Sequence, residues 1–209
     1  MTATLNKLEK QFYSDGYKLA AHAVEAGLTR DALFSAIRNM YHSIDEFNSS
    51  FSGFAKNHDQ KIDCTHGCEW CCYQPVFALN YELDYLKNFV VTRFDRQKQK
   101  AIQNRAGERK KKLDGLKKEE FLNSKFPCPL LEKSLCMAYE ARPMACRIYL
   151  STKLKTCLNF YKHPEDKNNY PALLSFPMRV GRMMNEGFKA ALKTNGIKPE
   201  EFRIEEKLC

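Results

Sequence analysis

The sequence predicts a mainly α-helical protein whose helical domain carries a loop-rich, cysteine-ligated metal centre. Three observations support this prediction: apolar residues recur at helical spacing over residues 5–54 and again after Pro177, four cysteines fall within residues 64–72, and four more follow between residues 128 and 157. At 209 residues and 44% hydrophobic composition the chain can bury a substantial core. We expect an N-terminal helical hairpin over residues 1–60 and a cysteine-cluster metal-binding domain over residues 61–209.

The N-terminal region reads as two helices. Residues 5–27 have apolar positions three and four apart, with an expected interruption around Ser14–Gly16. Thr29 is a suitable N-cap for a second helix, whose apolar residues between positions 33 and 54 repeat in heptads. This seam favours an antiparallel hairpin with the preceding helix, and a homodimer through the 33–54 helix is the alternative.

A basic segment follows the first cysteine group. Residues 75–79 are expected to be extended, and Asn80 is expected to cap a helix that continues into the segment. Residues 93–118 contain eleven basic and three acidic residues, so this arm carries +8 of the net charge of +9. Few apolar residues interrupt it, which predicts a solvated helix or a partly mobile arm. No nucleic-acid-binding motif accompanies the charge, so the pattern argues against nucleic acid and leaves docking of an acidic partner as the alternative to a merely solvated face.

The second cysteine group lies in irregular chain. Prolines on both sides of Cys128 exclude a regular helix there, and one helical turn is expected to begin at Pro143. A last amphipathic helix is expected from Pro177, closed by Asn195–Gly196, with the tail from Lys198 lying along the domain.

The chain shows no sign of a membrane or secretory segment. No apolar run approaches the roughly 18 residues needed to span a bilayer, and residues 1–10 lack the apolar core of a signal peptide. We therefore expect a cytoplasmic protein that does not contact membrane. In a reducing cytosol the nine cysteines favour metal binding over disulfides.

Two metal chemistries fit the cysteines. Zinc sites usually combine two CxxC-like pairs, and Cys68-x2-Cys71 qualifies as one, but the second group lacks such a pair. An iron-sulfur cluster accepts ligands from separated segments because its irons stand apart. A 4Fe-4S cluster is therefore favoured, zinc is the alternative, and one or two centres are both compatible with the count. The candidate ligands are Cys64, Cys68, Cys71, Cys72, Cys128, Cys136, Cys146 and Cys157.

Charged and aromatic residues near the cysteines are further candidates. Arg142 and Arg147 are expected to screen an anionic cluster or to bind a carboxylate of a cofactor, with pairing to Glu69 or Glu140 as the alternative. Tyr139 is expected to pack in the core or, alternatively, to donate a proton or contact a substrate.

Three other residues receive simpler expectations. Trp70 is expected to shield the centre from water. His66 is expected to hydrogen-bond a backbone carbonyl rather than to ligate. Cys209, the last residue, is expected to be a free thiol.

The two cysteine groups together resemble a known family. The pattern Cys64-x3-Cys68-x2-Cys71-Cys72, followed by Cys128-Pro129-Leu130-Leu131 and by Arg142-Pro143-x2-Cys146-Arg147, resembles the YkgJ-type cysteine-cluster family, a zinc- or iron-chelating domain. The resemblance covers roughly residues 64–157. The family's better understood relative, flagellin lysine N-methylase, is similar in the cysteine tetrad.

That relative implies an iron-sulfur cluster used with S-adenosylmethionine to methylate protein lysines. For this chain it implies an S-adenosylmethionine-dependent enzyme acting on a protein or peptide, with Tyr139, Arg142 and Arg147 as catalytic residues and both arginines as cofactor-binding residues. The alternatives are a zinc-stabilised interaction module with a basic docking arm, and a metal storage or delivery protein.

Overall fold

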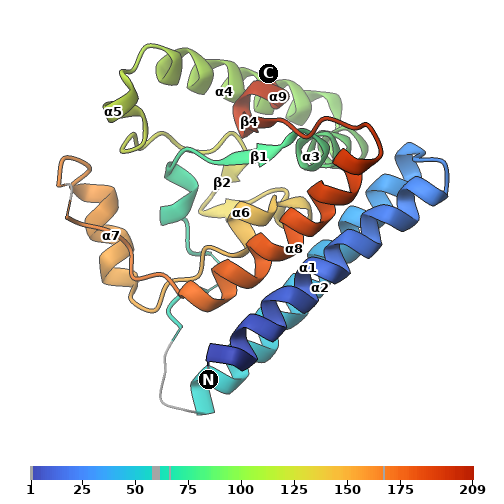
Figure 1. The fold of residues 1–209 in the computed structure, drawn as a ribbon. Helices are drawn as coiled ribbons and strands as arrows, with labels where there is room; N and C mark the ends of the chain where they lie inside the picture. The colour runs from blue at the N-terminus through green and yellow to red at the C-terminus, as the bar shows by residue number, and fades with distance from the viewer. Residues whose placement is uncertain (1, 58–61, 66, 167) are drawn as a thin grey trace. The chain divides into compact units, whose positions relative to one another are not determined.

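The computed structural model describes residues 2–57, 62–65, 67–166 and 168–209, and it divides the chain into two compact units. The first, here the helical unit, combines residues 1–60 with Leu174–Glu200; the second, here the cysteine unit, combines residues 61–173 with Glu201–Cys209. Helices dominate both units and the strands are short, which confirms the mainly α class (Figure 1). The predicted division at residue 60 differs from these units in the position of one helix, Ser175–Thr194, which belongs to the helical unit.

The helical unit contains three long helices, α1 (Thr2–Glu25), α2 (Arg30–Asn57) and α8 (Ser175–Thr194). Thr29 caps α2 as predicted, because its Oγ1 accepts a hydrogen bond from the Ala32 amide at 3.2 Å. The heptad residues Ile37 and Met40 are fully buried, and Phe47 packs edge-on against Phe12 of α1, with ring centroids 5.2 Å apart. The seam is therefore used within the chain, as the hairpin interpretation expects.

The predicted interruption of the first helix is wrong. α1 runs without a break through Gly16, because this glycine serves a contact between helices and not a turn. A Cβ atom at Gly16 would lie 2.0 Å from the Met184 carbonyl oxygen of α8, and one at Gly187 of α8 would lie 1.9 Å from the Tyr13 carbonyl oxygen. Only glycine permits so close a crossing. α8 ends as predicted, with Gly196 at φ +80° and the Ile197 amide bonded to the Leu192 carbonyl.

The cysteine unit is built from short elements around two longer helices, α3 (Asn80–Arg93) and α4 (Arg96–Asp114). The tail lies along this unit as predicted: β4 (Glu201–Arg203) pairs antiparallel with β1 (Phe77–Leu79), which is the expected extended segment. The remaining elements are η1 (Trp70–Tyr73), β1 (Phe77–Leu79), α5 (Lys118–Phe121), β2 (Leu131–Glu132), β3 (Leu135–Cys136), η2 (Tyr139–Ala141), α6 (Met144–Arg147), α7 (Leu154–Lys162), β4 (Glu201–Arg203) and α9 (Ile204–Leu208).

The basic segment is an ordered helix rather than a mobile arm. Asp95 caps α4 by accepting a hydrogen bond from the Lys98 amide at 2.8 Å. Ile102, Ala106 and Leu113 bury one face of the helix, while most of its lysines stay exposed. Apolar residues at helical spacing thus bury one face of a segment whose composition suggested solvent on all sides.

The start of α3 differs by one residue from the prediction. Asn80 is the first helical residue, and Leu79 occupies the N-cap position. The Leu79 amide donates instead to the carboxylate of Glu82, with an N–O distance of 3.2 Å. Within the described part of the chain, no helix combines the length and apolar character that a membrane span requires.

Candidate metal centre

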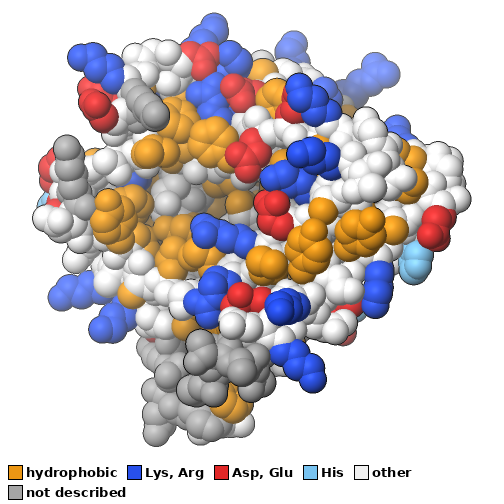
Figure 2. All heavy atoms as spheres, in the orientation of Figure 1, with side chains coloured by type: hydrophobic (Ala, Val, Ile, Leu, Met, Phe, Trp, Pro, Cys, Tyr) orange, Lys and Arg blue, Asp and Glu red, His pale blue; other side chains and the backbone are white. Residues whose placement is uncertain are grey.

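Seven cysteines surround one cavity in the cysteine unit. The cavity has a volume of about 370 Å³, and most of its wall is apolar. Figure 2 shows a hollow on one face, surrounded by hydrophobic side chains, a class that includes cysteine in that view. Of the eight predicted ligands, those that line the cavity are Cys64, Cys68, Cys71, Cys72, Cys128, Cys136 and Cys146. Cys64 and Cys146, 82 positions apart in the sequence, thereby line the same site.

The first cysteine group is held by backbone contacts to the chain after α6. The Cys64 sulfur accepts a hydrogen bond from the Ser151 amide at 3.1 Å, and the Asp63 amide donates to the Ser151 carbonyl at 3.0 Å. Cys71 and Cys72 lie in the single 3-10 turn η1. The Cys128 amide donates to the Cys72 carbonyl at 2.8 Å, so this bond joins the two cysteine groups directly.

The second group is shaped by a tight hairpin. β2 pairs with β3, and the two turn residues, Lys133 and Ser134, have φ values of 50° and 63°. Positive φ at both central positions is the signature of a type I′ turn, which normally selects asparagine and glycine. The hairpin brings Cys136 to the cavity, although neither turn residue signals this conformation in the sequence.

Cys146 is placed by a buried carboxylate that sequence analysis missed. Glu82, 1% exposed, accepts hydrogen bonds from the Leu79 amide and, at 2.8 Å, from the Met144 amide at the start of α6. Because α6 carries both Cys146 and Arg147, Glu82 ties the cavity wall to the start of α3.

The predicted arginines both line the cavity but differ in their contacts. Arg147 is 1% exposed, and its guanidinium donates to the backbone carbonyls of Arg142, at 2.9 Å, and of Glu140. Arg142 stacks on Tyr139, with its Cζ atom 3.6 Å from the ring centroid. Tyr139 is 48% exposed, so the expectation that it packs in the core is wrong. All three residues line the same cavity as the cysteines.

The cavity raises the pKa of most of its thiols. Burial raises the pKa of Cys64 and of Cys128 to about 11 and that of Cys146 well above its usual value. Cys71 differs, because a hydrogen bond from Cys72 and the positive charge of Arg142 lower the pKa of its thiol. In the metal-free protein most of these sulfurs therefore carry protons at neutral pH, and a metal must displace them.

A hydrogen-bonded pair behind the cysteines was also missed. The Gln74 side-chain amide lies 2.9 Å (Nε2) and 3.1 Å (Oε1) from the Tyr149 hydroxyl, and both residues line the cavity. Burial raises the pKa of Tyr149, so its hydroxyl stays protonated as a donor. No local pattern in the sequence connects these two residues.

Three of the remaining candidates, Cys157, Trp70 and Cys209, are not among the residues that line the cavity. Cys157 is buried on α7 and does not line the cavity. Trp70 packs against Tyr161 of the same helix, with ring centroids 5.1 Å apart. Cys209 is exposed and free, as predicted, and His66 lies outside the described residues.

The thiols encircle the cavity without closing on one point. Among the residues that the structure describes, no three or more His, Cys, Asp or Glu side chains are arranged so that they could hold a metal ion as they stand. The donor set is nevertheless that of a soft-metal site, since thiolates select zinc, copper(I) and iron-sulfur centres. Ligation therefore requires the thiols to turn inward.

Comparison with known proteins identifies the kind of domain. No curated protein and no solved structure matches the chain significantly. The family model CxxCxxCC, described as "putative zinc- or iron-chelating domain", matches residues 63–171. Because this match spans half of the chain and contains every cysteine of the cavity, the chain belongs to this family of metal-binding domains.

Proposed function

We propose that the chain binds an iron-sulfur cluster, of the 4Fe-4S type, in the cavity of the cysteine unit. The observation that carries this proposal is the size of a cavity lined by seven thiols, about 370 Å³. A water molecule accounts for only about 30 Å³ of liquid volume, so the space suits a group of many atoms.

Zinc fits this cavity less well. A structural zinc site is closed: four ligands meet one ion, with sulfurs about 2.3 Å from the metal, and no cavity remains. Here thiols from η1, β3, α6 and two loops line the same space, and the second cysteine group provides no CxxC pair. A cluster accepts such separated ligands because each cysteine binds a different iron.

The first ligands to test are Cys64, Cys68 and Cys71 or Cys72, with Cys146 as the distant partner. A cluster bound there would supply electron transfer, or an iron site open to a further ligand. The apolar wall would exclude water, and the charge of Arg142, which already lowers the pKa of Cys71, would favour anionic sulfur.

Anaerobic purification tests the proposal, with measurement of iron, zinc and acid-labile sulfide and a visible absorption spectrum. About four irons with matching sulfide per chain are expected. Cys146→Ser should lose most of the iron, whereas Cys209→Ser, at an exposed thiol outside the cavity, should retain it. Colourless protein that contains zinc and no sulfide would contradict the cluster proposal and favour a zinc-stabilised interaction module.

A second candidate function is favoured by the residues that share the cavity with the thiols. Tyr139, Arg142 and Arg147 all line it, as the S-adenosylmethionine-dependent enzyme hypothesis requires. Arg142, with its guanidinium stacked on Tyr139, is the candidate partner for the cofactor's carboxylate.

Binding of S-adenosylmethionine to the iron-loaded protein tests this candidate. The cofactor should perturb the visible spectrum and raise the melting temperature, and Arg142→Gln should weaken both effects. If the cofactor changes neither property at saturating concentration, the cluster has another role and the methyltransferase-like activity is excluded.

A further inference from the structure

The segment Glu201–Cys209 contributes one residue to the cavity wall, Ile204, although it lies outside the family match. β4 pairs with β1, with Phe77 opposite Arg203, and the Ile204 amide donates to the Val76 carbonyl at 3.2 Å. Ile204 also lines the cavity. Since the family match ends at residue 171, this part of the wall is contributed by the chain's own C-terminal segment.

A buried arginine of the basic helix connects the two cysteine groups. Arg109 is 5% exposed, and its guanidinium donates to the Gln74 carbonyl at 2.6 Å and to the Phe126 carbonyl at 2.7 Å. Gln74 follows Cys72 by two residues and Phe126 precedes Cys128 by two. The planar guanidinium thus joins the two backbones two residues away from the Cys128–Cys72 hydrogen bond.

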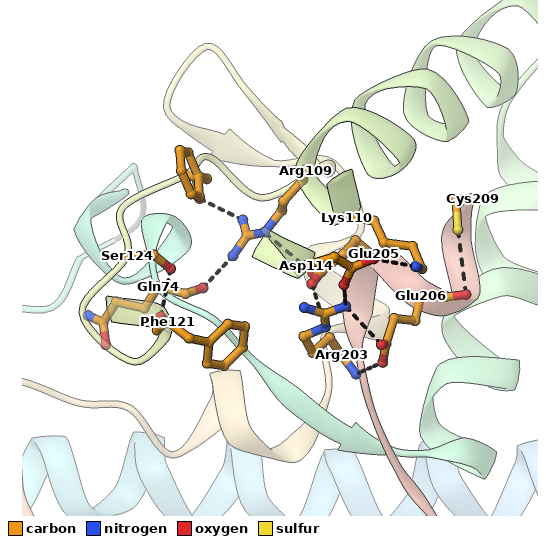
Figure 3. Close-up of polar contacts among 11 residues, drawn as sticks. Gln74, Arg109, Lys110, Asp114, Phe121, Ser124, Arg203, Glu205, Glu206 and Cys209 are labelled. Atoms are coloured by element: carbon orange, nitrogen blue, oxygen red, sulfur yellow. Dashed lines mark hydrogen bonds and ion pairs between the residues drawn. The ribbon is translucent and has the colours of Figure 1, made fainter. Parts of the chain in front are cut away.

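The C-terminal segment supplies the counter-charge for this arginine. Glu205 is 1% exposed, and its Oε2 lies 3.4 Å from Arg109 Nε. Arg203 lies on its other side, with Nε 3.2 Å from Glu205 Oε1, and also contacts Asp114 and Glu206. Figure 3 shows the Arg109 guanidinium between Gln74 on one side and Glu205 on the other, with Arg203 beyond.

We infer that Arg109 and Glu205 are positioning residues, which set the spacing of the two cysteine groups and make metal affinity depend on the C-terminal segment. The inference rests on the proposed metal function. A buried guanidinium without a counter-charge is costly, so Glu205 keeps Arg109 in place. Arg109 in turn fixes the carbonyls beside Cys72 and Cys128.

Lysine cannot replace Arg109 in this arrangement. Its single ammonium cannot span two carbonyls and a carboxylate that the guanidinium fork reaches together. Arg109→Lys therefore keeps the charge and removes the bridge, while Glu205→Gln keeps the side-chain volume and removes the counter-charge. Lys111→Gln, at an exposed position of the same helix, changes charge without touching the bridge and is the matched control.

The test compares these full-length variants for zinc affinity by chelator competition, for the spectrum of the cobalt(II)-substituted protein, and for the melting temperature of the metal-free protein. Residues that orient metal ligands typically change metal affinity by about 10- to 100-fold. We expect this loss in Arg109→Lys and Glu205→Gln, with altered cobalt bands and with no further loss when the two are combined. Lys111→Gln should retain wild-type affinity.

The three readouts separate positioning from mere support of the fold. Wild-type affinity and cobalt spectrum in both variants would overturn the inference, even if the metal-free protein melted at a lower temperature. Should Arg109→Lys prevent folding, Glu205→Gln decides alone, because its amide fits the same volume. A wild-type chain that binds no zinc, cobalt or iron would overturn the proposed function itself, and the inference with it.

Discussion

The close crossing of α1 and α8 predicts that replacing glycine by alanine destabilises the protein at this point, although the same replacement normally stabilises a helix. Gly16→Ala would place a Cβ atom 2.0 Å from the Met184 carbonyl oxygen and 2.9 Å from its carbon. Carbon and oxygen atoms in favourable contact are about 3.3–3.6 Å apart, so the two helices must separate by more than about 1 Å. The clash is with backbone, which cannot rotate away.

The magnitude follows from two opposing effects. Alanine gains about 1 kcal/mol of helix propensity over glycine. Overpacking in a core costs about 1–3 kcal/mol, and a clash with backbone belongs at the upper end or beyond. We therefore expect Gly16→Ala to destabilise the helical unit by about 2 kcal/mol or more. Gly187→Ala should behave alike, since its Cβ would lie 1.9 Å from the Tyr13 carbonyl oxygen.

Gly53 of α2 provides the matched control. A Cβ there meets nothing within 4 Å, so Gly53→Ala should stabilise the protein by about 0.5–1 kcal/mol. Urea denaturation followed by far-UV circular dichroism measures both variants. If Gly16→Ala proves as stable as Gly53→Ala, α1 and α8 do not cross at these glycines and the reasoning is refuted.

Three further predictions concern the cysteine unit. Burial raises the pKa of Cys64 and Cys128 to about 11, so metal binding must release their protons. Zinc affinity, measured by chelator competition, should therefore rise between about pH 6 and pH 9 and fall on acidification. A pH-independent affinity would contradict this prediction. Glu82→Ala leaves two buried amides without their acceptor and should cost about 2–5 kcal/mol in urea denaturation, whereas an exposed glutamate such as Glu108 should tolerate alanine. Replacing the turn Lys133-Ser134 by Asn-Gly should raise stability by about 1 kcal/mol, and a loss would show that the turn is not type I′.

The parts of the fold that sequence predicts are those with local causes. The α2 helix shows its cap at Thr29 and its heptad seam within the helix itself, so both are confirmed. Gly16 misleads because sequence shows a glycine but not the helix that crosses it. The partnership of α8 with α1 is equally hidden, since nothing in residues 175–194 indicates which hydrophobic surface the helix will cover.

The site divides in the same way. The clustering of cysteines in the sequence was enough to identify eight candidate metal ligands, and seven of them line one cavity. The residues that hold their backbones were missed because each is a single charged or polar side chain acting over a long separation, as in the 62-residue gap between Glu82 and Met144. Arg109 was missed because it lies in a run of basic residues, and the sequence does not distinguish the buried one from its exposed neighbours.

The packing of the cysteine unit bears on what the metal is for. Leu83, Leu86, Ile102 and Leu113, on α3 and α4, are almost completely buried, so the cysteine unit has an apolar core besides its thiols. A domain that folds only with zinc typically lacks such a core, since metal binding supplies its folding free energy. Here metal binding would mainly stabilise the loops around η1 and Cys128. These loops surround the cavity, so the centre would order a site rather than support a fold, which favours a functional metal over a structural one.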